Sequence, residues 1–228
     1  MTESPTDETP VALLDAIEER DLGSLIEKGA TTPEYYPMSL NALTNACNQN
    51  TNRNPVVEFD DKMVARALES MRDKGLVRVI TGADQRVPKH RHVFDEAMGL
   101  SAAQTAVLSE LMVRGPQTVG ELRGRANRMH PFDELSQVEA VLQELAARDP
   151  AGVLQLLRQP GRKESRYAHL FAGQPADAGE QDAPPEAATL EVRAENERIA
   201  TLEASVEELR AEVTSLREEL ATFRQQFE

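Results

Sequence analysis

Basic side chains gather in two short segments of this sequence, and each segment lies between two runs that favour β-strands. The first segment holds Arg86, Lys89 and Arg91, and the second holds Arg158, Arg162, Lys163 and Arg166. Lysine and arginine in such places contact the phosphates of nucleic acid, although basic turns are also common as solvated tips. We add Lys62 and Arg66 of a predicted helix and Arg53 of the loop before it. These ten residues are our candidate nucleic-acid contacts.

The residue types that support catalysis or metal binding lack the partners that these chemistries need. His90 and His92 project to one face of a strand, a spacing that two metal ligands could share. Residues 86–92 contain no cysteine or carboxylate, and Lys89 and Arg91 would repel a cation. Cys47, the only cysteine, lies on the apolar stripe of a predicted helix and is expected to be a buried hydrophobic residue. Phosphate loops, GxSxG and HExxH are absent, so we expect no metal, no cofactor and no enzymatic activity.

The elements that must position the basic residues follow one plan twice. In the first copy, a helix stops at Gly29, a short helix follows Pro37, a third helix follows Phe59-Asp60, and strands are predicted at 76–80 and 92–94. In the second copy, a helix runs from Ser101 to Gly115, a short helix follows Pro116, a third follows Phe132-Asp133, and strands are predicted at 153–157 and 167–171. Ser101 with Gln104, and Thr118 with Glu121, fit capping boxes. Coincidence is the alternative to a duplication.

Three helices followed by a hairpin is the plan of a winged helix-turn-helix module. We therefore predict a mainly α fold with small β-hairpins, made of two tandem winged helix-turn-helix domains at 11–96 and 97–172. Residues 1–10 are predicted to be a disordered tail. Residues 173–189 are a Pro/Ala-rich acidic linker, and residues 190–228 a C-terminal coiled-coil helix.

Three segments resemble the YceH family of uncharacterised bacterial proteins. They are TTPEYYPMSLNALTNACNQNTNRNPVVEFDD (31–61), RALESMRDKGLVR (66–78) and ELRGRANRMHPFDEL (121–135). The resemblance covers about residues 11–172. It implies a tandem pair of winged-helix domains and no established activity, cofactor or catalytic residue.

The two third helices are expected to expose faces of different charge. If Val64, Ala67, Leu68 and Met71 face the core, the first helix exposes a mixture: Asp61, Lys62, Ala65, Arg66, Glu69 and Arg72. The second exposes Glu134, Gln137, Glu139, Gln143 and Glu144, with no base before Arg148. Carboxylates repel phosphates, so we do not expect the second helix to read DNA. The second module can bind through its hairpin or hold a protein instead.

Residues 45–55 (NACNQNTNRNP) are unusually rich in side-chain amides. Such amides contact phosphates or base edges, and they also stabilise turns by bonding their own backbone. The turn interpretation is favoured. Tyr35 and Tyr36 nearby fit either stacking on a base or partner, or covering the edge of a small core.

The net charge of −14 comes mostly from the predicted tail, linker and coil, which carry −3, −4 and −5. The globular part is close to neutral, so the total charge does not exclude nucleic acid. No run reaches about 18 apolar residues, so no membrane span is expected. The N-terminus, MTESPTDETP, is acidic and polar, unlike a signal peptide, and a cytoplasmic location is expected.

Apolar residues between 199 and 227 alternate at spacings of three and four, which is a heptad pattern. Ile199, Val206, Val213 and Leu220 occupy a positions, and Leu202, Leu209, Leu216 and Phe223 occupy d positions. β-Branched residues at a with leucine at d favour a parallel two-stranded coil, and Glu212 and Glu219 would meet the partner's Arg217 and Arg224. We predict a homodimer. A single amphipathic helix packed back on the globular part is the alternative.

Two functions fit these observations. A non-enzymatic, dimeric winged-helix protein that binds DNA through its basic hairpins, as a transcriptional regulator, is the leading hypothesis. A protein–protein interaction scaffold that uses the same modules and coil is the alternative, favoured by the acidic second helix and the net charge.

Removing the predicted coil tests the dimer. Sedimentation of the full chain is expected to give a dimer and that of residues 1–189 a monomer, because the heptads supply the contact between chains. The assignment fails if both species sediment as monomers.

Overall fold

The computed structural model describes residues 14–81, 87–158 and 164–173. Within these residues the chain is mainly helical, with a few short antiparallel strand pairs. The predicted tail, nearly all of the predicted linker and the predicted coil with its dimerisation residues lie outside them, as do Arg86, Arg162 and Lys163. Among the described helices, none has the length and apolar content needed to cross a membrane.

The first half of the described chain, residues 14–100, holds three principal helices and a three-stranded sheet. Its elements are α1 (Ala16–Thr31), the 3-10 helix η1 (Pro33–Tyr35), β1 (Met38–Ser39), α2 (Leu40–Cys47), α3 (Asp61–Asp73), β2 (Val77–Ile80), β3 (Lys89–His92) and α4 (Phe94–Met98). The sheet has the order β1-β3-β2, and both pairs are antiparallel.

The second half, residues 101–173, follows the same order with α5 (Ala102–Arg114), α6 (Val119–Ala126), α7 (Leu135–Ala146), β4 (Val153–Gln155) and β5 (Tyr167–His169). Gln117, just before α6, exchanges two backbone hydrogen bonds with Tyr167 of β5. Gln117 thus corresponds to β1 of the first half, which precedes α2 and pairs with β3. The predicted succession of three helices and a strand pair is therefore present in both halves. Their assignment as winged-helix domains with a boundary at 96/97 stays a prediction.

Local sequence signals account for most helix ends. The capping boxes of Ser101 with Gln104 and of Thr118 with Glu121 are confirmed, and Gly115, with φ 72°, ends α5 as predicted. The predicted stop at Gly29 is wrong, because α1 continues to Thr31. A Cβ at Gly29 would lie 3.4 Å from the ring of Tyr36, which is close to ordinary van der Waals contact.

The second strand of the first hairpin lies earlier than predicted. β3 ends at His92, and Phe94 begins the short helix α4. The Phe94 side chain is completely buried and meets Phe171 edge to face, with ring centroids 5.1 Å apart. This packing against the other half removes Phe94 from the strand.

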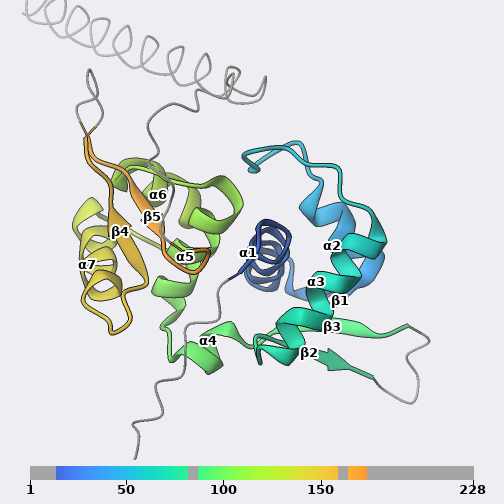
Figure 1. Cartoon of the computed structure of the whole chain (residues 1–228). Coiled ribbons are helices and arrows are strands. Elements are labelled where there is room, and N and C mark those ends of the chain that lie inside the picture. The colour runs from blue at the N-terminus through green and yellow to red at the C-terminus, as the bar shows by residue number, and fades with distance from the viewer. Residues whose placement is uncertain (1–13, 82–86, 159–163, 174–228) are drawn as a thin grey trace, which may run out of the picture. The chain divides into compact units, whose positions relative to one another are not determined.

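The two halves share one continuous hydrophobic core, with α1 packed against α5 (Figure 1). Equivalent parts of the repeat contact each other: α1 meets α5, and Phe94 meets Phe171. Gly23 and Ser109 also occupy equivalent places, and the Ser109 hydroxyl donates a hydrogen bond to the Gly23 carbonyl at 3.0 Å. Contacts between equivalent surfaces are the pattern of a two-fold dimer interface, here formed within one chain.

Gly23 lets α1 and α5 approach closely. A Cβ there would lie 2.8 Å from Cγ1 of Val113 and 3.0 Å from Cβ of Met112. Gly23→Val is therefore expected to lower the free energy of unfolding by about 1–3 kcal/mol, measured by urea unfolding of the full chain. Gly124→Val, in α6 with open space around it, is the control and should change that free energy by less than about 0.5 kcal/mol. Equal effects of the two substitutions would contradict the close contact.

Candidate nucleic-acid interface

Helix α3 presents an outer face of mixed charge, as predicted, with Asp61, Glu69 and Asp73 exposed beside its bases. Val64, Ala67, Leu68 and Met71 are buried as predicted, and they fix the rotation of the helix. Lys62, Arg66 and Arg72 are exposed on the outer side. Within the described part of the chain, neither Lys62 nor Arg66 forms an ion pair, whereas Arg72 lies 3.5 Å from the exposed Asp73. Lys62 and Arg66 can therefore meet phosphates at little cost in broken contacts.

The first hairpin divides its charges between two faces. The register pairs Val79 with His90 and Arg78 with Arg91. Because neighbouring side chains on a strand point to opposite faces, Arg91 and Lys89 lie on the face opposite to His90. Glu96 accepts a hydrogen bond from Arg91 at 3.0 Å and lies 3.5 Å from Arg78. One carboxylate thus partly neutralises two of the hairpin's bases.

The second half offers fewer free bases than its sequence suggests. Arg158 is exposed and Arg166 half-buried. The outer face of α7 carries the predicted acids and amides, all exposed: Glu134, Gln137, Glu139, Gln143 and Glu144. Helix α7 itself contains no lysine or arginine. The third helix of the second half therefore presents negative charge.

The arginines around α6 have structural partners. Arg123 donates to the carbonyls of Phe132 and Asp133, which fastens the loop before α7. Arg125 donates to the side chain of Gln117. Arg128 pairs with Glu110 at 2.9 Å and also with Glu27. These side chains hold the fold together, which lowers their availability for a ligand.

The prediction that Arg53 contacts nucleic acid is wrong. Its side chain is 0 % exposed, and its guanidinium donates to Glu27 at 2.6 Å and to the carbonyl of Ala46. The loop after α2 turns inward and brings Arg53 beside α1, where a buried carboxylate needs a cation. Arg53 therefore stabilises the core and cannot reach a phosphate in this structure.

A buried polar cluster joins the two halves, and sequence reasoning missed it. Glu27 of α1 and Glu110 of α5 are 1 % and 0 % exposed, and Arg128 contacts both. Asn52, in the left-handed region at φ 54°, donates to the carboxylates of both. Burial raises the pKa of Glu27, but Arg53 and Arg128 more than offset this, and the pKa lies below its ordinary value. Only the packing of α1 on α5 could reveal these partners.

The amides of residues 45–55 mainly bond within the protein. Asn48 exchanges two hydrogen bonds of 2.8 Å with the backbone of Phe59. Asn54 donates from its backbone to the carbonyl of Val113 and from its side chain to that of Arg114. These bonds run to other segments and not to the local backbone, so they do not show the turn interpretation, which stays a prediction. Of the two tyrosines, Tyr36 accepts a hydrogen bond from the backbone of His92, while Tyr35 is 73 % exposed.

The described histidines and Cys47 do not form a metal site: no group of three potential ligands exists among the described residues. Cys47 is buried, as predicted, and its thiol donates to Asp21 at 3.0 Å. Burial, the charge of Asp21 and that hydrogen bond raise the pKa of the thiol. A protonated, enclosed thiol is a poor nucleophile.

Asp21 makes the stability of the fold depend on pH. Burial raises its pKa to about 7 from an ordinary value near 3.8, although the Cys47 hydrogen bond opposes the shift. The folded state therefore binds this proton more tightly, and between about pH 4 and 7 the contribution of Asp21 to the free energy of unfolding falls as the pH rises. Asp21→Asn should flatten this decline, which amounts to a few kcal/mol. Urea unfolding at pH 5 and pH 8 measures it.

Asp73→Asn, at an exposed position on the same half, is the control and should keep the wild-type decline. If Asp21→Asn also keeps it, the raised pKa is contradicted.

The family model described as "Protein of unknown function, DUF480" matches residues 14–162. The UPF0502 protein of Geotalea daltonii is 60 % identical over 190 residues, which is 83 % of this chain and 87 % of the relative. That of Geobacter sulfurreducens is 56 % identical over 218 residues, 95 % of this chain and 99 % of the relative. The finer resemblance to the YceH proteins stays a prediction. Because both comparisons span most of the chain at high identity, this protein belongs to the DUF480 (UPF0502) family of uncharacterised bacterial proteins.

Proposed function

We propose that this chain is a non-enzymatic DNA-binding protein of two winged-helix modules, dimerised by the segment 190–228, with a role in transcriptional regulation. The first half is the principal DNA-binding module. The observation that carries the proposal is the outer face of α3, where Lys62 and Arg66 are exposed and form no ion pair within the described residues. In a winged helix-turn-helix module, the third helix is the one that enters the major groove.

We propose that the second half contacts DNA only through its hairpin. Its third helix, α7, exposes carboxylates, so only the second hairpin with Arg158 and Arg166 is positioned for phosphate contact. Two copies of the chain would bring two such pairs of modules to one DNA molecule. Linked weak sites bind more tightly than single ones when the geometry allows both to engage.

The proposal is tested by duplex DNA binding of the full chain at several salt concentrations. Lys62→Gln with Arg66→Gln should weaken binding and lower the slope of log affinity against log salt by about 2, because each lost phosphate contact removes about one counterion. Replacing Arg86, Lys89 and Arg91 together by alanine should also weaken binding. Arg193→Gln with Arg198→Gln, the same charge change in the predicted coil, is the control.

The proposal is refuted if the wild type does not bind at low salt, or if both sets of variants bind as tightly as the control. A DNA-independent effect on the fold would appear as a loss of helicity in circular dichroism.

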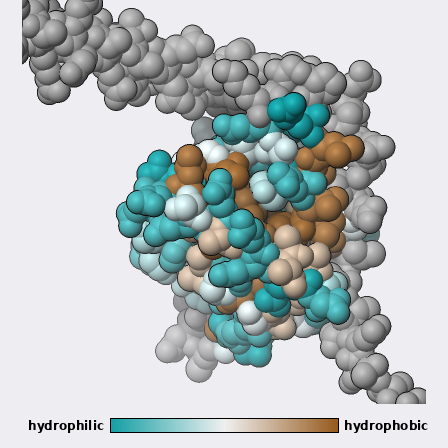
Figure 2. Space-filling model, turned by 90° about the vertical axis from the view of Figure 1, so that its left-hand side faces the viewer, coloured by the Kyte–Doolittle hydropathy of each residue, from teal (hydrophilic) through white to brown (hydrophobic). Residues whose placement is uncertain are grey.

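A second candidate function, a protein-binding scaffold, is favoured by the surface of the second half. Leu135, Leu154 and Leu157 are exposed large hydrophobic residues, and Leu157 is 94 % exposed. Figure 2, which views the side of α7 and the second hairpin, shows hydrophobic residues gathered at the surface. Recovery of a defined protein partner after nuclease treatment, lost in Leu154→Ser with Leu157→Ser, would favour this function.

A further inference from the structure

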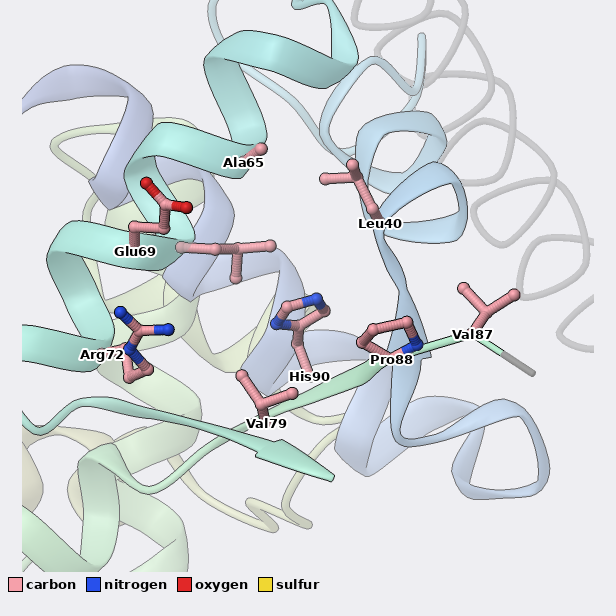
Figure 3. A pocket seen from close by; sticks show the side chains of 9 residues that line it. Leu40, Ala65, Glu69, Arg72, Val79, Val87, Pro88 and His90 are labelled. Carbon is pink, nitrogen blue, oxygen red and sulfur yellow. The ribbon is translucent and has the colours of Figure 1, made fainter. Parts of the chain in front are cut away.

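A pocket of about 380 Å³ opens between α2, α3 and the first hairpin. Its apolar wall comes from three separate elements: Leu40 of α2, Leu68 of α3 and Val79 of β2 (Figure 3). Concave, mostly apolar spaces of roughly 300–1,000 Å³ are the typical sites of small ligands. The pocket is therefore large enough for a ligand of one or two rings.

Three polar side chains converge on this apolar space. Glu69 and Arg72 come from α3, and the ring of His90 projects from β3 toward them (Figure 3). Among residues 14–81, 87–158 and 164–173, the one ion-pair partner of the Arg72 guanidinium is the exposed Asp73 at 3.5 Å, and an exposed pair of this kind contributes little. It can therefore exchange Asp73 for an anion in the pocket.

His90 is the third polar side chain in the lining of the pocket. Its Nδ1 atom is buried and has no hydrogen-bond partner among the described residues. Burial lowers the pKa of the ring, so His90 is uncharged at neutral pH and does not draw a second anion. Because the ring lines the pocket, a polar atom of a ligand can contact it there.

We propose that this pocket binds a small apolar molecule that carries a single anionic group. The apolar body lies against Leu40, Leu68 and Val79, the anion meets Arg72, and a polar atom of the ligand bonds to His90. Glu69 at the same border repels a second negative charge, which limits the ligand to one. The site would thus prefer a ligand with one negative charge to a neutral ligand or to one with two negative charges.

The pocket also has a consequence for regulation, which rests on the proposed function. Its occupant would lie between α3 and the hairpin, the two elements proposed to contact DNA. A bound anion neutralises Arg72 and adds no positive charge, so occupancy lowers the affinity of the first half for DNA. The ligand would act as an effector that releases DNA.

Two fluorescent dyes that differ in one group test the site in the full chain. 8-Anilinonaphthalene-1-sulfonate is apolar with one anionic group, and N-phenyl-1-naphthylamine is the same molecule without the sulfonate. Saturable binding of both to the wild type is expected. Arg72→Gln should weaken binding of the sulfonate dye about two- to fivefold and leave the neutral dye unchanged, as for a partly exposed ion pair.

Filling the pocket should abolish binding of both dyes. Ala65→Trp does so from α3, and Val79→Trp does so from β2, where an aromatic side chain suits a strand. Thermal unfolding shows whether each variant is folded, and Val79→Trp decides if Ala65→Trp is not. Leu157→Ser removes the most exposed leucine of the second half and is the control that should bind both dyes as the wild type does.

Absence of saturable binding, binding that survives in folded Val79→Trp, or binding that is lost in Leu157→Ser overturns the site. An Arg72→Gln variant that binds the sulfonate dye normally overturns the anion preference. With binding established, the sulfonate dye should lower duplex DNA affinity, and an unchanged affinity overturns the regulatory step. Failure of the wild type to bind DNA without dye refutes the proposed function and leaves the dye result standing.

Discussion

The packing of α1 against α5 is the contact on which the rest of the structure depends. Leu22, Leu25, Leu108 and Leu111 are completely buried within the shared core, and Gly23 allows the two backbones to approach until the Ser109 hydroxyl reaches the Gly23 carbonyl. The backbone of Leu14 donates to the carbonyl of Phe171 at 2.7 Å, which ties the first described residue to the end of the second half. Each half therefore completes its core with the other, and the repeated units form one body.

Burying charge at this contact restricts how the halves can fit together. Glu27 and Glu110 lose water when α1 meets α5, and they are stable there only because Asn52 and Arg53 of the loop after α2 and Arg128 after α6 reach them. Removing one member of such a cluster leaves an uncompensated buried charge, which costs about 3–5 kcal/mol. The loop after α2 must consequently keep its inward path. The cluster thus favours one arrangement of the halves over others with similar apolar contact.

The use of basic side chains in internal contacts also makes the surfaces of the two halves differ in charge. In the second half, Arg123, Arg125 and Arg128 are used to fasten loops and to neutralise buried acids, which leaves the acidic face of α7 dominant. In the first half the bases of α3 lie outside the core and stay accessible, beside a pocket that borders the hairpin. Duplicated units with equal plans can therefore take different partners: the first is suited to phosphates, and the second to its hydrophobic hairpin surface.

The sequence by itself determined the order of the three principal helices and the strand pair in each half, the buried faces of α3 and α7, the two capping boxes and the end of α5. These features depend on residues within about one helical turn of each other, where spacing and backbone hydrogen bonding decide the outcome. Only the tertiary structure decided that Arg53 is buried, that Phe94 leaves the strand for a helix and that Gly29 lies inside α1. Glu27 and Phe171, the partners that explain the first two of these positions, are brought in from distant segments by packing. A linear pattern of residue types does not contain that information, because the cost of burying a charge or a ring depends on what surrounds it in space.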